Sequence, residues 1–407
     1  MMRVLHVVKT SNGAEWAALQ AAELVRLGVD VHVALPFPEG NTVRSWQQSG
    51  AILHFVTLDF PVRAPWRLPG VCRAARQLIA ELNPDIVHSH FVGTTLVLRR
   101  ALGKRHPIPR VFQIPGPLHL EHSLFRVWEL STAGASDYWV ASSRYIQSLY
   151  SHYGVPRERL FLSYYGFRCD EFSAVRSGVL RQRLGVPADS VVAGNISYMY
   201  APKYYLGQHV GVKCHEHIIA ALALAMKKEP RLIGVLVGSA WGQHKWYEHK
   251  LRRMALAMSG GRIYMPGFVC HEEIRGFWPD FDVVLHVPLS ENCGGVHEPM
   301  VAGVPVIAGR VGGLPELVID GVTGRTVEPR RPDLLADLLL EVLSDLERYR
   351  AIAVNGRALV TSMFDVRRTS GEIFEIYKHI LDRRHPRPNE FGLQIAADDE
   401  RKGAILP

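Results

Sequence analysis

Short apolar runs rich in Val, Ile and Leu alternate along the chain with longer segments of helical period, and this alternation constrains the fold more than any other feature. In the first part of the chain it predicts helices at residues 15–27 and 72–82, and strands at 4–8, 30–35, 52–56, 85–88, 110–113 and 139–141. Strands that alternate with helices in this order form parallel βαβ units. We therefore expect an α/β protein with a doubly wound sheet.

The same rhythm restarts after residue 172, with a helix at 179–184 and strands at 191–196, 232–237, 263–264, 283–287 and 304–308. A length of 407 residues exceeds the roughly 250–300 at which one hydrophobic core stops growing. We predict two Rossmann-like domains, residues 1–172 and 173–366, followed by a C-terminal helix (367–383) that crosses back to the first domain and a loosely ordered polar tail (384–407). Ligands of such sheets bind beyond the carboxyl ends of the strands, so the site is expected in the cleft between the domains.

The cysteines and apolar runs bear on the compartment. The five cysteines are odd in number and scattered, which argues against a disulfide framework and for a reducing compartment. The longest apolar run, residues 218–226, is shorter than the roughly 18 residues of a membrane-spanning helix. A cytoplasmic protein is expected, with peripheral attachment to the inner face of the membrane as a further possibility.

The net charge of +8 includes a local cluster made of Arg99, Arg100, Lys104, Arg105 and Arg110. Such a cluster could attract anionic lipid, a phosphorylated acceptor or nucleic acid. The plainer interpretation is a solvated helix end and loop. Because no nucleic-acid-binding motif accompanies the cluster, we expect no nucleic-acid partner, while peripheral membrane contact stays open.

The loop after the strand at 283–287 carries the densest set of functional residue types: Ser290, Glu291, Asn292, Gly294, Gly295 and Glu298. Two adjacent glycines let the backbone approach a bulky anion closely. If a helix opens near Gly295, its free N–H groups and the positive end of its dipole favour an anion there. Glu291 and Glu298 flank this position and can accept hydrogen bonds from sugar hydroxyls.

At these residues the chain resembles the retaining GT-B-fold glycosyltransferases of family 4, whose signature continues from a glutamate into Glu-Ala-Met-Ala-x-Gly-x-Pro-Val. The run from Glu298 to Val306 fits it, and further matches lie at 86–91, 165–172, 268–269 and 311–324, so the resemblance extends over most of the chain. It implies transfer of a sugar from a nucleoside-diphosphate sugar to an acceptor hydroxyl, with retention of anomeric configuration. The implied acceptor is a small molecule or a lipid-linked glycan.

The two acids of the motif carry different implied roles. In the family the second acid contacts the ribose and the first contacts hydroxyls of the donor sugar, which assigns these roles to Glu298 and Glu291. Only six residues separate the two acids here, one fewer than in the family, and Ser290 stands where the first acid would align. Either Glu291 reaches the sugar through an altered loop, or Ser290 and Asn292 share its role.

The family also places an Arg and a Lys-Gly in the first strand-to-helix loop of the second domain, where both contact the diphosphate. Lys213 fits the lysine, Cys214 replaces the glycine, and Asn195 stands at the position of the arginine. Lys203, from a longer loop, could supply the missing cation. A P-loop is excluded, because its Gly-x-x-x-x-Gly-Lys pattern does not occur.

In the first domain the resemblance points to two loops. Gly13, in a segment similar to the family's Gly-Gly-Ala-Glu, can bring backbone N–H groups to the diphosphate or can simply end a turn. The family's His-Gly is replaced by Pro115-Gly116, so His119, and after it His122, is the candidate for the histidine beside the reacting sugar. A neutral imidazole there could act on the acceptor proton, and a structural histidine is an equal alternative.

No cofactor and no metal ion are expected. His88 with His90, and Cys214 with His215 and His217, lack a third and fourth ligand at any metal-binding spacing. Lys213 and backbone N–H groups can neutralise the leaving diphosphate without Mg²⁺. The alternatives are another GT-B enzyme, such as a sugar-nucleotide epimerase, and an inactive homologue that only binds the sugar nucleotide. The oligomeric state is left open.

Overall fold

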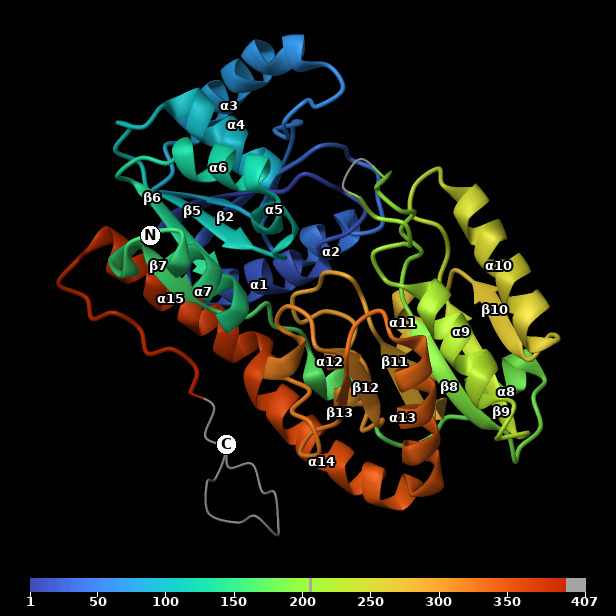
Figure 1. The fold of residues 1–407 in the computed structure, drawn as a ribbon. Coiled ribbons are helices and arrows are strands. Elements are labelled where there is room, and N and C mark those ends of the chain that lie inside the picture. Colours follow the sequence, from blue (N-terminus) through green and yellow to red (C-terminus); the bar gives the residue numbers. More distant parts are fainter. Residues whose placement is uncertain (205–206, 393–407) are drawn as a thin grey trace. The chain divides into compact units, whose positions relative to one another are not determined.

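The computed structural model describes residues 1–204 and 207–392. The chain forms two compact units: residues 1–167 together with 363–392, and residues 168–362 (Figure 1). Each unit is built on a parallel sheet with helices on both faces. This is the two-domain, Rossmann-like architecture that the alternating pattern predicts.

The described part of the first unit holds seven parallel strands in the order β3-β2-β1-β4-β5-β6-β7. The central strands are buried along nearly all of their length, which agrees with their mainly apolar sequences. Their bounds are β1 Arg3–Val7, β2 Asp30–Leu35, β3 Ile52–Phe55, β4 Ile86–Ser89, β5 Arg110–Ile114, β6 Asp137–Ala141 and β7 Leu160–Leu162.

The helices of the first unit are α1 Glu15–Arg26, α2 Val43–Gln48, α3 Leu68–Leu82, α4 Val92–Leu102, α5 Leu118–Glu121, α6 Ser123–Ser131, α7 Arg144–His152 and α15 Val366–Leu381, with 3-10 turns at Pro65–Arg67 and Arg157–Arg159. Helix α3 begins four residues before the predicted start because Pro69 occupies its first turn, where the missing N–H of proline costs nothing.

The C-terminal helix α15 belongs to the core of the first unit, as predicted. Its residues Ile373, Ile376, Tyr377 and Ile380 recur at helical spacing and pack in one cluster with β1, β2 and α1. The Asp365 side chain caps the helix by accepting a hydrogen bond from the Arg368 backbone N–H at 2.9 Å.

The segment after α15 is held against the first unit, so the prediction of a loose tail from residue 384 is wrong for residues 384–392. The Arg387 guanidinium lies over the Phe161 ring and donates to the Leu160 carbonyl at 2.5 Å. Phe391 lies under the Arg368 guanidinium, 4.5 Å from ring centroid to Cζ. Residues 393–407, the rest of the predicted tail, lie outside the described residues.

The described part of the second unit holds six parallel strands in the order β10-β9-β8-β11-β12-β13. Their bounds are β8 Val191–Ile196, β9 Leu232–Val237, β10 Ile263–Gly267, β11 Val283–His286, β12 Val306–Gly309 and β13 Arg325–Val327. Strand β12 starts two residues later than predicted, after Pro305, which has no N–H for a ladder hydrogen bond.

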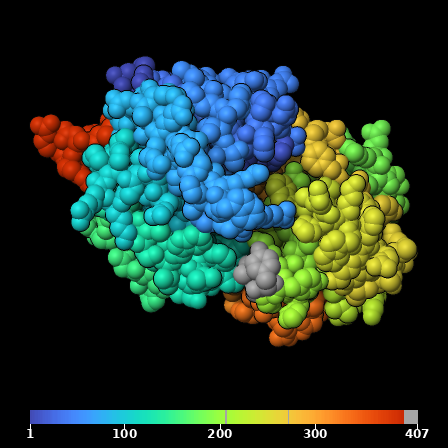
Figure 2. All heavy atoms as spheres, turned by 90° about the horizontal axis from the view of Figure 1, so that it is seen from above, coloured from blue at the N-terminus to red at the C-terminus, as the bar shows by residue number. Residues whose placement is uncertain are grey.

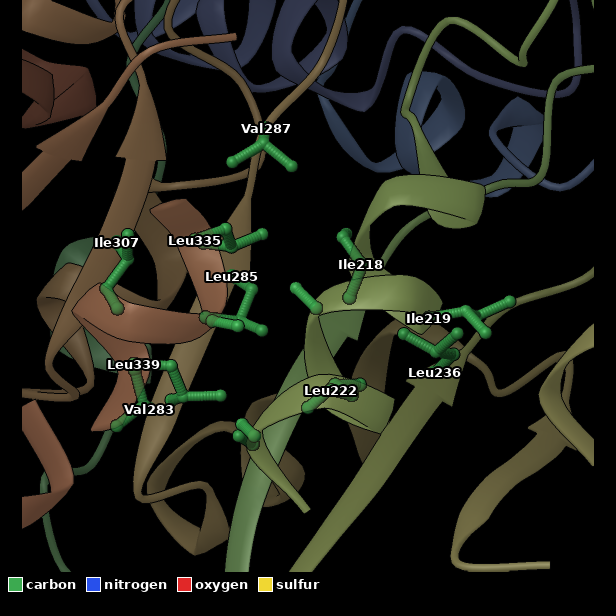
Figure 3. Packing of buried hydrophobic residues seen from close by; sticks show 14 of the residues in the cluster. Ile218, Ile219, Leu222, Leu236, Val283, Leu285, Val287, Ile307, Leu335 and Leu339 are labelled. Atoms are coloured by element: carbon green, nitrogen blue, oxygen red, sulfur yellow. The ribbon is translucent and has the colours of Figure 1, made fainter. Parts of the chain in front are cut away.

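The helices that cover this sheet are α8 Val179–Leu184, α9 His215–Ala225, α10 Lys245–Ser259, α11 His271–Phe277, α12 His297–Val301, α13 Pro332–Ser344 and α14 Leu346–Phe364, with 3-10 turns at Cys169–Glu171, Trp278–Asp280 and Leu314–Glu316. Helices α9 and α13 pack on one face of the sheet. Ile218, Leu222 and Leu339 lie there against Leu285 and Ile307 (Figure 3).

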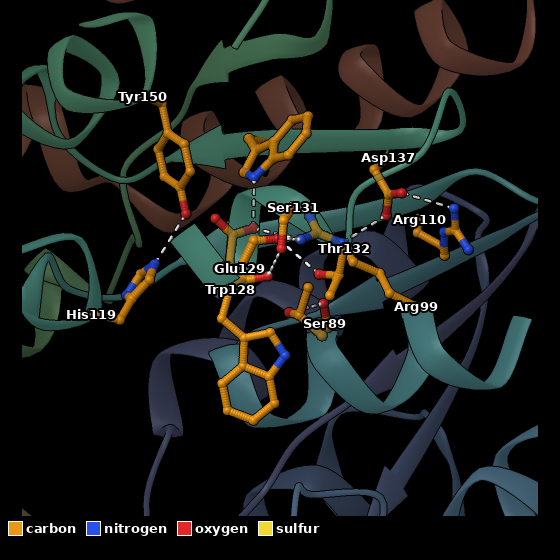
Figure 4. A network of polar contacts seen from close by, with 12 residues as sticks. Ser89, Arg99, Arg110, His119, Trp128, Glu129, Ser131, Thr132, Asp137 and Tyr150 are labelled. Atoms are coloured by element: carbon orange, nitrogen blue, oxygen red, sulfur yellow. Dashed lines mark hydrogen bonds and ion pairs between the residues drawn. The ribbon is translucent and has the colours of Figure 1, made fainter. Parts of the chain in front are cut away.

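The basic cluster seen in the sequence is divided by the fold, so its interpretation as one solvated patch is wrong. Arg99 and Arg110 are buried and pair with Asp137, and Arg99 also pairs with Glu129 on α6 at 2.7 Å (Figure 4). Buried guanidinium groups need such partners, because an unpaired buried charge is costly. Only Arg100, Lys104 and Arg105 of the cluster are exposed.

A third histidine joins His88 and His90, contrary to the expectation that none is available. His6 on β1 pairs with His88 on the neighbouring β4, so the three buried rings stack with centroids 4.3–5.1 Å apart. His6 Nδ1 and His90 Nε2 lie 2.9 Å apart, a hydrogen-bond distance. His88 contacts the Tyr377 hydroxyl and thereby ties α15 to the sheet.

Across residues 1–204 and 207–392, no helix is both long and apolar enough to cross a membrane. All five cysteines are free thiols.

Candidate functional site

The strand order of the second unit places two loops side by side. Strands β8 and β11 are neighbours in the sheet although they are far apart in the chain, which makes their junction the topological switch point where open α/β sheets bind ligands. The loop after β8 reaches Lys213, and the loop after β11 contains Glu291. A backbone hydrogen bond from the Leu289 N–H to the Val212 carbonyl (2.8 Å) holds the two loops together.

Lys213 and Glu291, both predicted site residues, form an ion pair at this junction. Their side chains retain 17% and 13% of their exposure. Burial raises the pKa of Glu291, but the Lys213 ammonium and a hydrogen bond from His286 outweigh this and lower it to about 2. Glu291 is therefore ionised at neutral pH, so it can accept hydrogen bonds from hydroxyls but has no proton to donate.

His286, the last residue of β11, orients the Glu291 carboxylate through a hydrogen bond. The side-chain amide N–H of Asn195 donates to the Leu285 carbonyl at 2.5 Å and lies 3.1 Å from His286 Nδ1. This contact makes Nδ1 the acceptor, so the proton of the neutral ring sits on Nε2, which lies 3.2 Å from Glu291 Oε2. Burial lowers the pKa of His286, which favours this neutral form.

The glycines around Glu291 are required by space as well as by backbone conformation. Gly295 has a φ of 77°, and a Cβ there would lie 2.3 Å from the His286 ring. A Cβ on Gly312 would lie 1.7 Å from the Glu291 carbonyl oxygen. Gly294 adjoins the Glu291 carboxylate, since a Cβ there would lie 3.2 Å from Oε1. The two predicted glycines therefore pack against the side chains that form the site.

Helix α12 begins at His297, two residues later than predicted, and has only five residues. Its dipole is correspondingly small, so backbone N–H groups of the loop are better suited to hold an anion than the helix end. Glu298 lies in its first turn, where Oε2 accepts a hydrogen bond from the buried Trp278 indole N–H at 2.9 Å. This contact fixes the carboxylate predicted to bind the ribose.

Three further predicted site residues of the second unit, Ser290, Asn292 and Lys203, lie in the loops after β8 and β11. Asn292 is buried, and its side-chain oxygen lies 3.9 Å from the Cys293 sulfur; its backbone N–H donates to Glu291 Oε1 at 3.1 Å. Ser290 is half-buried beside Glu291. Lys203 is half-buried in the loop after β8, where its backbone N–H donates to the Gln208 side chain at 3.0 Å.

Cys214, which follows Lys213, has a φ of 52° and is fully buried. Left-handed backbone favours glycine, which accounts for the glycine that the resemblance implies at this position. Asn195, at the position of the expected arginine, is buried in the hydrogen bonds to Leu285 and His286. It therefore supports the site and adds no charge to it.

Gly13, the predicted donor-binding residue of the first unit, lies in the loop after β1, which borders the β1–β4 switch point of its own sheet. Its carbonyl accepts a hydrogen bond from Thr42 Oγ1 at 3.1 Å. The left-handed conformation falls on the next residue, Ala14, with a φ of 64°. Its proposed contact with the diphosphate stays a prediction.

His119 lies against the core of the first unit. Its Nε2 is 3.1 Å from the Tyr150 hydroxyl (Figure 4). The ring also forms a hydrogen bond to the backbone of Gly116. Burial lowers the pKa of His119 to about 4, so the ring is neutral at pH 7. These contacts give the His119 ring a structural role, and its contact with the reacting sugar stays a prediction. His122 packs edge-on against Phe125.

Sequence reasoning missed His286 and Trp278, the two residues that hold the acids in place. A signal for His286 is present: it is the polar residue in the apolar run from Val283 to Val287. Trp278 directly follows α11 and carries no comparable signal, because a tryptophan there is indistinguishable from an ordinary core residue.

Two doubly wound parallel sheets on one chain, with a lysine–carboxylate pair at the switch point of the second, are the arrangement expected of a glycosyltransferase of the GT-B class. Comparison with known families agrees with this class. Residues 203–359 match the family described as "Glycosyl transferases group 1", and residues 12–171 match "Glycosyltransferase Family 4". The chain belongs to this family of glycosyltransferases.

Several curated proteins of bacteria are similar to this chain over half of its length or more. A "D-inositol 3-phosphate glycosyltransferase" of Xylanimonas cellulosilytica is 29% identical over 276 residues, which cover 64% of this chain and 61% of that enzyme. The enzyme of the same name from Arthrobacter sp. (strain FB24) is 27% identical over 389 residues and 89% of both chains. The match to that of Thermobispora bispora covers about half of it, 53%.

Solved structures share the fold. Anabaena Alr3699/HepE, in complex with UDP and glucose, superposes with a TM-score of 0.76 at 22% identity, over 93% of this chain and all of that one. Sucrose-phosphate synthase from Thermosynechococcus elongatus superposes with a TM-score of 0.72 at 18% identity, over 93% and 99% of the two chains.

Proposed function

We propose that this glycosyltransferase takes a sugar from a nucleoside-diphosphate donor and transfers it to an acceptor hydroxyl with retention of anomeric configuration and without a metal ion. The Lys213–Glu291 pair at the β8–β11 switch point carries this proposal. One member of the pair can face the leaving diphosphate and the other can face the hydroxyls of the sugar. We also propose a cytoplasmic location, in keeping with the free thiols.

In the proposed reaction the bond between the anomeric carbon and the diphosphate oxygen breaks, and the diphosphate leaves with the electron pair. The acceptor oxygen forms the new bond on the same face of the sugar, and its proton passes to the departing oxygen. Lys213 and the N–H groups near Gly294 and Gly295 stabilise the charge that develops on the diphosphate. Glu291, ionised and oriented by His286, accepts hydrogen bonds from the donor sugar.

Glu298 is the proposed ribose contact. With Oε2 held by Trp278, the other oxygen, Oε1, makes no hydrogen bond to any residue in the described part of the chain and can accept from a ribose hydroxyl. Gly13, Lys203, Ser290 and Asn292 remain proposed donor contacts, and His119 a proposed contact of the reacting sugar. The UDP bound to Alr3699/HepE supports a nucleotide-sugar donor, and the name of the curated relatives makes D-inositol 3-phosphate the first acceptor to test.

The test measures transfer with purified protein against a panel of nucleotide sugars, with D-inositol 3-phosphate and other polyols as acceptors. NMR of the product reports its anomeric configuration. Activity should persist in excess EDTA, and a strict need for an added divalent cation would refute the metal-free site. Release of an epimerised sugar nucleotide without transfer would instead indicate an epimerase.

Replacing Lys213 by Met should lower kcat/KM by about 10²–10³, as expected for removal of one group that stabilises the leaving charge. Lys228→Met is the matched control, because Lys228 is 70% exposed on the same unit and meets only Asp337 at 3.7 Å. Equal activity of the two variants would refute the role of Lys213. Donor binding with no turnover in the wild type would point to an inactive homologue.

A further inference from the structure

Helix α6 of the first unit exposes apolar side chains and buries a charged one, which is the reverse of an ordinary surface helix. Glu129 is its buried residue, whereas Leu124, Val127 and Trp128 retain 74%, 61% and 37% of their exposure. A helix on a globular protein normally turns its apolar side inward and its charged side to water. The exposed apolar side of α6 therefore calls for a partner.

The inward side of α6 is held by charge. Glu129 pairs with Arg99 of α4 at 2.7 Å and accepts a hydrogen bond from the Trp139 indole N–H at 3.0 Å (Figure 4). Leu124, Val127 and Trp128 stand three and four residues apart and thus share one face of the helix. That face takes no part in the attachment of α6 to the sheet.

The exposed face of α6 borders a hollow of about 460 Å³. Trp128 and Ser131 line it from α6, and Leu96 lines it from α4. Phe60 lines it from the loop before α3, and Leu68 lines it from the start of α3. Phe60 meets Trp128 edge to face, with ring centroids 4.9 Å apart. The loop between Phe60 and Leu68 exposes further large apolar side chains, those of Val62 (79%) and Trp66 (75%).

Cations surround these apolar groups. Arg100, in the last turn of α4, and Lys104, just after the helix, line the hollow. Arg105 follows them, and the loop at 60–68 contributes Arg63 and Arg67. All five are exposed, and none forms an ion pair within residues 1–204 and 207–392. Segments 60–68, 99–105 and 121–131 contain a single exposed acid, Glu121. Figure 2 looks onto this side of the first unit, where residues 60–105 are light blue to cyan.

We propose that this amphipathic face, formed by α6, the loop at 60–68 and the end of α4, docks the enzyme onto an anionic phospholipid bilayer. Apolar side chains ringed by lysine and arginine are the composition of interfacial membrane-binding elements, and tryptophan favours the headgroup region. Each cation near an anionic bilayer strengthens attachment. The five cations lie around the apolar side chains with a single exposed acid among them, which matches the continuous negative charge of an anionic bilayer.

Vesicle co-sedimentation tests the proposal with the full-length protein. Vesicles of phosphatidylcholine containing about a third phosphatidylglycerol should bind the protein, whereas pure phosphatidylcholine should bind it at least about tenfold more weakly. Salt at about 0.5 M should weaken the binding, because it screens exposed charges. Two double variants, Leu124→Ser/Val127→Ser and Arg100→Glu/Lys104→Glu, should each lower the partition coefficient by at least about tenfold.

Matched changes on the second unit serve as controls. Leu256→Ser/Val354→Ser removes two apolar side chains that are each 65% exposed, and Arg253→Glu reverses an exposed charge. Both should keep wild-type binding, and every variant should keep the wild-type affinity for free nucleoside diphosphate, which shows an intact fold. The proposal is overturned if phosphatidylglycerol does not enhance binding, or if the variants of the amphipathic face bind as the wild type does. It is also overturned if those variants convert a dimer to a monomer in light scattering, which would identify a second copy as the partner.

Discussion

Because Lys213 and Glu291 neutralise each other, removing the charge of Glu291 should strengthen diphosphate binding and slow sugar transfer. Glu291 neutralises Lys213 in the structure. Replacing Glu291 by Gln leaves the Lys213 charge uncompensated, so the product nucleoside diphosphate should bind several-fold more tightly. Transfer should fall by about tenfold or more, because a charged acceptor for the sugar hydroxyls is lost. Calorimetry for binding and initial rates for transfer measure the two effects.

Glu347→Gln is a suitable control for Glu291→Gln, because it removes an exposed acid of the same unit from the first turn of α14, outside the β8 and β11 loops. It should leave both quantities near wild type. If Glu291→Gln weakens diphosphate binding, the carboxylate does not compete with the diphosphate for Lys213, and the assignment of roles within the pair is wrong.

Substituting Gly295 and Gly321 by alanine distinguishes the cost of a strained backbone from the cost of a steric clash. Both have left-handed φ values, 77° and 73°, but a Cβ on Gly321 meets nothing within 4 Å, whereas one on Gly295 meets the His286 ring at 2.3 Å. Gly321→Ala should cost about 1–2 kcal/mol of unfolding free energy. Gly295→Ala should cost more and should also lower transfer, because it displaces His286. Urea unfolding and initial rates test this, and equal effects of the two changes would contradict it.

The attachment of α6 to the first unit depends on the buried group Arg99, Glu129 and Asp137. Removing Glu129 leaves the Arg99 charge poorly compensated in the core, so Glu129→Ala should destabilise the first unit by about 3–5 kcal/mol. Glu328→Ala breaks the Arg310–Glu328 pair, whose side chains are 53% and 56% exposed, and should cost under about 1 kcal/mol. Chemical denaturation compares the two, and similar costs would show that the buried pair does not hold α6.

The stack of His6, His88 and His90 makes the unfolding free energy of the first unit depend on pH. Burial lowers the pKa of His6 to about 3 and holds those of His88 and His90 well below the ordinary value. The unfolded chain takes up these protons near pH 6.5, but the native state does so only at much lower pH. The stabilising contribution is therefore complete above about pH 6.5 and is lost as the pH falls towards about 3.

Between pH 6 and pH 5 each such histidine should steepen the loss of unfolding free energy by roughly 1 kcal/mol per pH unit. His6→Gln removes one titrating group and should flatten the dependence by that amount. Urea unfolding at a series of pH values, all above the range where carboxylates titrate, measures the slopes. Identical slopes for wild type and variant would mean that the ring does not stay neutral in the native state.

Local pattern was sufficient for most of the architecture. Strands and helices were found within a few residues of their observed bounds, because buried parallel strands are continuous apolar runs and the helices between them keep their own period. The misplaced ends, at α3 and β12, follow from prolines at positions where they fit without a hydrogen bond. The segment at 384–392 was misjudged because its anchors, Phe161 and Arg368, are distant in the chain.

The motif residues near Glu298 and the candidate Lys213 could be named from residue types and spacing alone, since strand-to-helix loops carry the chemistry of α/β sheets. The ion pair between Lys213 and Glu291 could not be predicted in this way. Lys213 and Glu291 are 78 residues apart and meet because β8 and β11 adjoin in the sheet. The pairing of Arg99 and Arg110 was likewise not predictable: the sequence suggested solvated charges, whereas the fold pairs them with acids on α6 and β6. Linear sequence records which groups a chain carries and the period of its elements, whereas strand order decides which charges meet, and so which are buried and which face water.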